Sequence, residues 1–398
     1  MNRLIVIVLL VCSPVTVFAF YDWDTDTGSG NVRGLVRVYG QALDYPDTIP
    51  LSDDTGLAEL TRLIIEGEVG SDLAYEVNLY QTHIPRSLAS TDLSRRDVER
   101  SARLEWSFSD EDFSRVAFDR LNLRASWDRL DVTVGRQAIN LATTFYFTPN
   151  DFFAPFAAQS FFRVYKPGVD AVRAEIRLGD LSQLSLVQVL GFAPDNTTDT
   201  NWGRGADSQR DSFVARISTV FRDVEWKLLA GHIGEIDIIG GSLQGDLFEW
   251  LGIRAEGHIA DPVTGDQYSE VSVGLEHSRE SSLDLRVEYF HHGSGVSRVS
   301  DYSALFASTQ NSYLARNYVA ASAGYEFTPL LTGNALLIKN LLDQSWLLSL
   351  YAVYSLSDEA ELAINLSLPA GDEPVGTAIN SEFGSSPAAL NIEVRSNF

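Results

Sequence analysis

The sequence has 398 residues, with 54 Asp and Glu against 30 Lys and Arg, a formal net charge of −24, and 45% hydrophobic residues. The apolar fraction excludes a wholly disordered chain, and the acidic balance argues against nucleic acid as a partner, since phosphates need a basic face. Beyond about the first 20 residues, no run approaches the roughly 18 consecutive apolar residues of a membrane-spanning helix, which excludes a polytopic helical membrane protein. A transmembrane β-barrel remains, because only alternate residues of its strands face lipid.

Residues 1–19 have the pattern of a secretory signal peptide. The positively charged Arg3 is followed by an apolar stretch, Leu4–Val11, and Ala19 ends a cleavage site of small residues. The single cysteine, Cys12, lies in this segment, so the mature chain would form no disulfide. We therefore expect an exported protein whose stability comes from packing or from a closed hydrogen-bonded sheet.

The remaining chain divides into a short periplasmic N-terminal arm at 20–30 and a β-barrel at 31–398. Throughout the barrel, segments of about ten residues alternate apolar and polar side chains. For example, Val271, Val273 and Leu275 alternate with Glu270, Ser272 and Glu276. Strands are predicted at about 31–43, 57–70, 72–84, 115–127, 130–139, 168–178, 182–192, 211–221, 224–234, 236–246, 249–260, 267–279, 282–293, 316–328, 331–341, 344–355, 359–368 and 388–398.

Connections between these segments determine the strand count. Tight links, such as Gly70-Ser71 and Asp128-Arg129, fall on one side of the membrane, and the long links fall on the other. This is typical of periplasmic turns and extracellular loops. Residues 99–108 also alternate, but a spanning strand there would break the parity, so we assign them to a loop hairpin. The fold class is therefore all-β: a transmembrane antiparallel barrel of about 18 strands, with 16 as the alternative. Closure removes the unpaired edges that hydrocarbon would penalise.

The signal peptide, the alternating strands and the terminal Phe398 resemble bacterial outer-membrane β-barrels. This resemblance implies that Phe398 is an assembly signal, and it places the chain in the outer membrane of a Gram-negative bacterium. Three segments, 134–137 (VGRQ), 147–156 and 165–173, resemble a family of porin-like proteins, and the GRQ strand is similar to alginate-export-type barrels. Arg136 lies on the apolar phase of its strand, which indicates a rim position, a nearby bulge or a register slip.

Charged residues on the polar phase of the strands are candidates for the pore wall. Arginines come mainly from the first half of the chain and carboxylates from the second, so the wall carries either two opposed arcs of charge or locally paired ions. The predicted pore-lining residues are Arg33, Arg37, Arg120, Arg124, Arg173, Arg177, Arg216, Glu270, Glu276, Asp284 and Glu288.

The link 140–167 is unusually aromatic for a connection between strands. So much apolar area would not stay in water, so the loop is expected either to fold into the barrel or to pack at a subunit interface. We favour the inward fold. The candidate constriction residues are Phe147, Asp151, Phe152, Phe153 and Phe156.

These patterns predict a porin-like channel for diffusion of small solutes or ions. The alternatives are an export or electron-conduit sleeve around a partner polypeptide or polysaccharide, a barrel enzyme, and an adhesin or anchor. No nucleophile, metal-ligand or cofactor motif occurs, so we expect no enzyme and no cofactor. The expected partners are outer-membrane lipid and lipopolysaccharide, the assembly machinery and small solutes, with a homo-oligomer left open.

Overall fold

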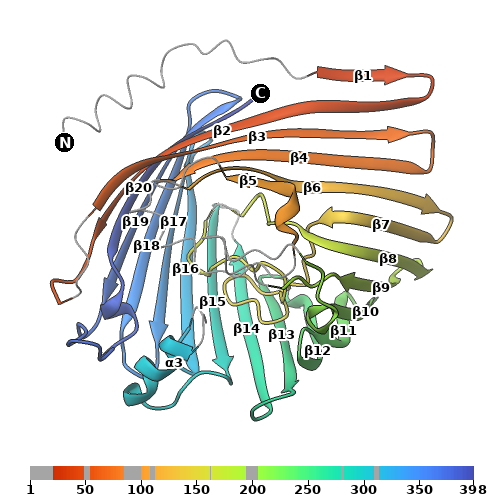
Figure 1. Cartoon of the computed structure of the whole chain (residues 1–398). Helices are drawn as coiled ribbons and strands as arrows, with labels where there is room; N and C mark the ends of the chain where they lie inside the picture. The colour runs from red at the N-terminus through yellow and green to blue at the C-terminus, as the bar shows by residue number, and fades with distance from the viewer. Residues whose placement is uncertain are drawn as a thin grey trace.

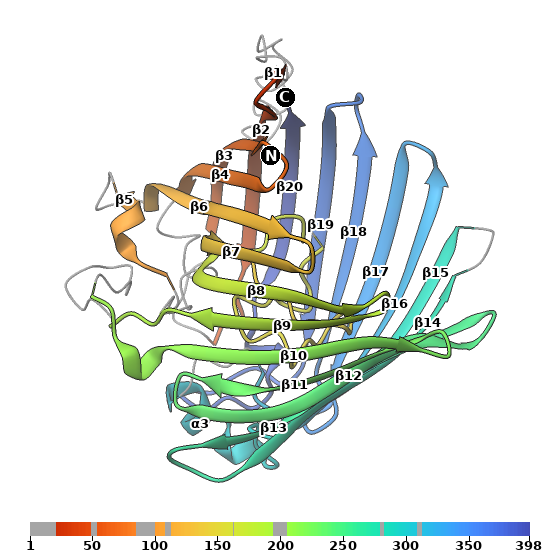
Figure 2. The same cartoon turned by 90° about the vertical axis from the view of Figure 1, so that its right-hand side faces the viewer.

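The computed structural model describes residues 21–48, 54–84, 100–107, 113–161, 163–193, 205–278, 282–308 and 313–398. Within these residues, twenty strands form a single sheet, and two of them, β1 (Tyr21–Thr25) and β5 (Glu105–Ser107), are short. The other eighteen follow one another around a barrel (Figures 1 and 2). They are β2 (Gly28–Asp44), β3 (Asp54–Val69), β4 (Leu73–Ile84), β6 (Phe113–Trp127), β7 (Leu130–Gln137), β8 (Val169–Gly179), β9 (Ser182–Val189), β10 (Ser212–Phe221), β11 (Val224–Ile233), β12 (Ile236–Phe248), β13 (Leu251–Pro262), β14 (Tyr268–Ser278), β15 (Leu283–His292), β16 (Asn317–Thr328), β17 (Leu331–Asn340), β18 (Trp346–Ser355), β19 (Ala360–Ala370) and β20 (Ala388–Asn397).

The sheet is closed by its first and last spanning strands. β2 pairs antiparallel with β20 from Leu35 opposite Asn397 to Asp44 opposite Ala388. The predicted antiparallel barrel and its count of eighteen strands are thereby confirmed for the described residues, and each predicted strand matches an observed one. The hairpin expected at 99–108 is also present, since β5 pairs with β6 without crossing the barrel.

The N-terminal boundary differs from the expected one. β1 pairs with the start of β2, and β2 begins at Gly28 rather than at residue 31. Residues 21–30 therefore belong to the sheet and are not a separate arm, because backbone groups beside the extended β2 find partners there. The predicted signal peptide lies outside the described residues.

The two ends of the barrel differ in the length of their connections. One end, here the turn end, has tight links such as 128–129 and 222–223; the other, the loop end, has the long links, including 138–168 and 371–387. Short helices lie in loop-end connections: η1 (Ala102–Leu104), η2 (Ser208–Arg210), η3 (Val299–Asp301), α3 (Tyr302–Ser308) and η4 (Phe383–Ser385). No helix in the described part of the chain is long and apolar enough to cross a membrane.

The exposure of the strands is inverted relative to that of a water-soluble protein. On β14, Val271, Val273 and Leu275 are 37–40% exposed, whereas Ser272 between them is completely buried. The inward side holds charged residues that are almost inaccessible, such as Glu256 and Glu288. An outer surface of apolar side chains around a polar interior is the pattern expected of a barrel in lipid.

Aromatic side chains gather at the turn end of the outer surface. Trp127 ends β6, Phe221 ends β10, and Trp250 lies in the turn between β12 and β13, all exposed. Aromatic rings of this kind are enriched where a barrel meets the lipid–water interface.

Phe398 completes the seam between β2 and β20. Its N–H donates to the carbonyl of Gly34 at 2.9 Å, and the Gly34 N–H donates to the Phe398 carbonyl. The Phe398 ring covers Gly34 so closely that a Cβ at that position would lie 2.1 Å from it. The final residue therefore contributes backbone pairing and a packed ring to barrel closure.

Deleting Phe398 is expected to reduce the amount of folded barrel, because two seam hydrogen bonds and the ring contact are lost. The measurement is the heat-modifiable fraction in isolated outer membranes. Gly34→Leu should act in the same direction, whereas Asn397→Ala should leave assembly unchanged, since it preserves both the chain length and the ring. Normal assembly of the deletion would contradict a role for Phe398.

Candidate functional site

The link 138–168, called here the inner loop, folds into the barrel and lies inside the ring of strands (yellow in Figure 1). The Tyr146 hydroxyl reaches Ser322 on β16, and Phe161 stacks on Tyr351 of β18 with ring centroids 4.7 Å apart. Closer to its return to β8, the ring of Tyr165 lies 4.4 Å from the Arg62 guanidinium of β3. The inner loop therefore spans the lumen, as the favoured prediction had it.

Two of the predicted constriction residues anchor the inner loop to the wall. Phe147 is 1% exposed and stacks on Phe290 of β15 at 4.8 Å. Phe153 is equally buried, in an apolar cluster of wall residues that includes Val187 and Val214. Their apolar area is removed from water by the wall, so neither ring faces an open path.

The porin-like segments 134–137 and 165–173 form a buried polar network where β7 leads into the inner loop. Arg136 binds Asp170 of β8 through two bonds, Nε–Oδ1 at 2.7 Å and Nη2–Oδ2 at 3.0 Å, and its side chain is 0% exposed. The same guanidinium donates to the carbonyls of Phe118 and Ser101. Gly135 precedes it with φ of +117°, where a Cβ would collide with the Leu121 carbonyl. The off-phase Arg136 is thus explained by an irregular backbone at the loop end.

The second half of the motif fixes the return of the inner loop to the wall. Lys166 and Asp151 form a buried ion pair, and Arg120 donates to the Lys166 carbonyl. Gly168 donates its N–H to Asp119 at 3.2 Å, and a Cβ on Gly168 would lie 2.1 Å from the Asp119 carbonyl. Arg120, predicted to line the pore, is instead buried in this network and positions the loop.

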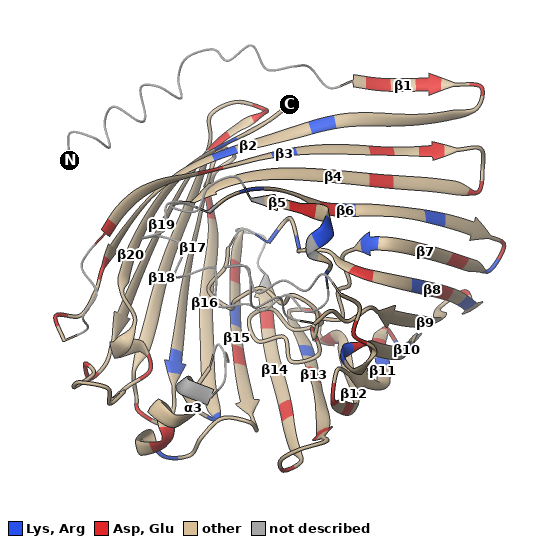
Figure 3. Cartoon of the chain, viewed as in Figure 1, with Lys and Arg blue, Asp and Glu red and all other residues tan. Residues whose placement is uncertain are grey.

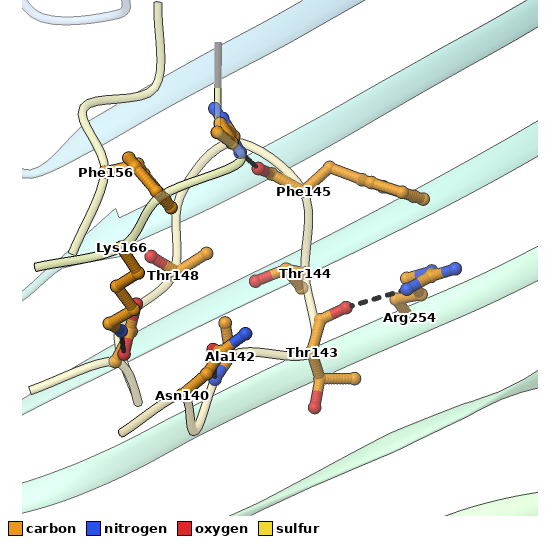
Figure 4. Close-up of a pocket in the computed structure, with 11 residues that line it drawn as sticks. Asn140, Ala142, Thr143, Thr144, Phe145, Thr148, Phe156, Lys166 and Arg254 are labelled. Carbon is orange, nitrogen blue, oxygen red and sulfur yellow. Dashed lines mark hydrogen bonds and ion pairs between the residues drawn. The ribbon is translucent and has the colours of Figure 1, made fainter. Parts of the chain in front are cut away.

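A cavity of about 270 Å³ lies between the inner loop and the wall. Figure 4 shows Arg254 of β13 bonded to the Thr143 carbonyl, at 3.3 Å, on one side of it. Arg163 donates to backbone carbonyls of the loop itself, including that of Ala158 at 2.8 Å. Phe156 lines this cavity together with Asn140, Ala142, Thr144, Phe145, Thr148, Asp151 and Lys166.

Most of the predicted wall charges are paired with near neighbours. Arg37 binds Glu393 at 2.8 Å, and Arg177 lies 3.6 Å from Asp131. Positive and negative residues occur on both halves of the wall (Figure 3), which favours local pairing over two opposed arcs. The other contacts of predicted residues are Arg33 with Glu66, Arg173 with Glu175, Arg216 with the Asn140 carbonyl, Glu270 with His292, Glu276 with Arg254, and Asp284 with Arg286; Arg124 sits opposite Thr133.

Neutralising Arg173 and Arg177 together is expected to move the reversal potential toward cations, because Glu175 and Asp131 are left uncompensated. The shift should shrink at 1 M salt, where the Debye length falls to about 3 Å. Reversal potentials of the purified channel under a salt gradient measure it. An unchanged potential at low salt would place both arginines away from the ion path.

The role of several residues of the site was not predicted from the sequence. Glu256 and Arg254 of β13, and Arg163 of the inner loop, were not among the predicted residues, although the alternation of β13 places its even-numbered residues inward. Glu288 was predicted to face water in the pore, but it lies beneath the inner loop and is 1% exposed. Its partners come from a segment more than 140 residues earlier in the chain.

A second buried carboxylate holds the loop 371–387 against the wall. Glu382 accepts hydrogen bonds from the Tyr318 hydroxyl at 2.5 Å, the Asn340 amide at 2.8 Å and the Leu314 N–H at 3.3 Å. Burial raises the pKa of the Glu382 carboxyl from 4.5 to about 7. The protonated form is therefore favoured when the loop is packed.

The packing of this loop is expected to weaken as the pH rises. Because the pKa of Glu382 is higher in the folded state, its contribution to stability is complete below about 4.5 and is lost as the pH passes through about 7. Hydrogen exchange of residues 371–387, corrected for the intrinsic rate, should show less protection at pH 8 than at pH 5. Glu382→Gln should abolish this dependence and the exposed Glu373→Gln should keep it; the same dependence in both would contradict the assignment.

Comparison with known proteins gives no match in sequence: no family model and no curated protein matches this chain. Solved structures do match. Acinetobacter baumannii OccAB1 aligns with a TM-score of 0.60 at 11% identity, over 93% of this chain and 96% of that one. OccAB4 of the same organism aligns at 0.60 and 8% identity, over 93% and 98%, and Pseudomonas aeruginosa OccK9 (OpdG) at 0.60 and 11%, over 93% and 98%.

The chain has the fold of the Occ barrels. The alignment covers nearly the whole length of both partners, so the likeness includes the eighteen-stranded wall and not a fragment of it. Identities of 8–11% mean that the likeness lies in the fold alone.

Proposed function

We propose that this protein is an outer-membrane channel for small solutes whose lumen is narrowed by the inner loop. The observation that carries the proposal is the combination of an apolar outer surface, a polar interior and a loop anchored across that interior. A barrel of 16–18 strands is wide enough for an aqueous channel unless something fills it. The inner loop reduces that width and gives the path its selectivity.

The position of the barrel in the membrane follows from its two ends. The turn end, with its aromatic girdle and both termini of the sheet, faces the periplasm, and the loop end faces outward. The outer membrane of a Gram-negative bacterium is the location that suits such a barrel.

The inner loop also argues against the sleeve alternative. A sleeve needs an unobstructed lumen for a partner polypeptide or polysaccharide, whereas the inner loop extends from β7 and β8 to contacts on β16 and β18 on the other side of the lumen. The cavity of about 270 Å³ suits a small molecule better than a chain.

Proteoliposome swelling tests the proposal. Liposomes containing the folded protein should swell in monosaccharides or small amino acids and should not swell in oligosaccharides, since the inner loop excludes large solutes. A heat-denatured sample provides the matched control. Absence of swelling with every solute, at verified incorporation of folded barrel, would overturn the channel function.

A further inference from the structure

Two carboxylates of the barrel wall bind the backbone of the inner loop. Glu256 of β13 uses both oxygens: Oε2 accepts the N–H groups of Thr143 and, at 3.0 Å, Thr144, while Oε1 accepts the N–H of Asn150 at 3.0 Å. The carboxylate is 2% exposed. It therefore binds the loop at the point where it enters the lumen and again after its first turn.

Glu288 of β15 continues this arrangement along the same segment. It accepts the N–H groups of Phe145 at 2.9 Å, Tyr146 at 3.2 Å and Phe147 at 2.6 Å. The two carboxylates together thus receive five successive backbone N–H groups, 143–147. A curved run of N–H groups around an anion is a recognised anion-binding arrangement of the backbone.

The wall and the loop satisfy each other's buried polar groups. Among the described residues, no Lys, Arg or His lies within ion-pair distance of Glu256 or Glu288, so the loop N–H groups are their main partners. On β14, which lies between these two strands, Ser272 is opposite Glu256 and Gly274 is opposite Glu288. Because both residues are small, the loop backbone can approach the wall closely. Buried carboxylates and buried N–H groups are both costly without partners, which makes the attachment strong.

We propose that Glu256 and Glu288 are the positioning residues of the constriction: they form a latch that holds the inner loop across the lumen and thereby sets the conductance. The inference rests on the proposed channel function. The aromatic contacts of Phe147 and Phe153 fix the loop laterally, while the latch fixes its backbone, so loss of the latch moves the segment 143–150 without removing the loop.

The test uses the isosteric variants Glu256→Gln and Glu288→Gln, singly and together, in the full chain. Each replaces one acceptor oxygen by an NH₂ group that faces the loop N–H groups. Losing one hydrogen bond to a charged group shifts an equilibrium by about tenfold, so we expect the ratio of high-conductance to low-conductance time to rise by about that factor for each variant. Glu361→Gln, a wall carboxylate whose ion pair is with Arg395, is the matched control and should behave as the wild type.

A readout of the loop itself separates positioning from general stability. A cysteine introduced by Thr148→Cys, at a position that lines the cavity, should react faster with a bulky water-soluble thiol reagent in the Gln variants, while their heat-modifiable folded fraction stays unchanged. If the double variant does not fold, Glu256→Asp, which retracts the carboxylate by one methylene, provides the same comparison with the charge kept.

The outcomes distinguish the latch from the channel. If a loop-shortened barrel conducts strongly while the Gln variants conduct and react like the wild type, the latch is overturned and the channel function stands. If neither the shortened barrel nor the Gln variants conduct, the channel function itself fails. Raised conductance and faster thiol reaction in the Gln variants, but not in Glu361→Gln, would support the latch.

Discussion

Shortening the inner loop between Thr144 and Lys166 is expected to raise single-channel conductance several-fold and to reduce discrimination between solutes. The loop crosses the lumen from its roots in β7 and β8 to Ser322 on β16 and Tyr351 on β18, and without it an eighteen-stranded wall encloses a water-filled path. Planar-bilayer recordings of purified wild-type and shortened protein measure the change.

The same variant decides between the two places for the loop's aromatic rings. Exposed apolar area costs roughly 25 cal/mol per Å², and in the structure the wall buries the rings of Phe147 and Phe153. If the loop instead served a subunit interface, conductance per channel would stay constant and an oligomer would dissociate in mild detergent. Unchanged conductance with an unchanged oligomer would remove the inner loop from the mechanism.

Replacing Arg136 by Met is expected to destabilise the barrel by about 3–5 kcal/mol, because it leaves the half-buried Asp170 carboxylate without its only ion-pair partner among the described residues. The guanidinium joins three strands and the 100–107 hairpin through Asp170, Phe118 and Ser101. Equilibrium unfolding in urea, with the refolded barrel in detergent, measures the loss.

A matched surface pair separates this effect from loss of charge alone. Arg177→Met removes an ion pair with Asp131 at 3.6 Å, but its side chain is 55% exposed, so a cost of about 0–1 kcal/mol is expected. Asp170→Asn in the Arg136→Met background should recover part of the stability, since no unpaired charge then remains. Equal costs at the two arginines would contradict the buried network.

The strands were predictable because the barrel imposes one rule at every spanning position. Lipid on one face of each strand and water on the other impose an alternation of period two. Tight turns at one end and long loops at the other alternate along the chain, and this alternation determines the number of spanning strands. The inner loop could be recognised as buried from its aromatic content. Arg136 was also a local signal, since an arginine on the apolar phase needs a buried partner.

The partners of the inner loop were not predictable in the same way. Alternation indicates that Glu256 and Glu288 face inward, but it does not indicate that a segment 113 residues before Glu256 lies against it. Such pairings depend on how the barrel closes and on how far the loop reaches. For the same reason the local pairing of wall charges, set by cross-strand register, appeared only in the structure.

The most direct test of this account is a planar-bilayer recording of the purified, unmodified protein. Discrete current steps of low conductance are expected, because the inner loop lies across an otherwise wide barrel. Absence of current steps at any voltage, both in this protein and in the loop-shortened barrel, with both folded by the heat-modifiability criterion, would contradict it.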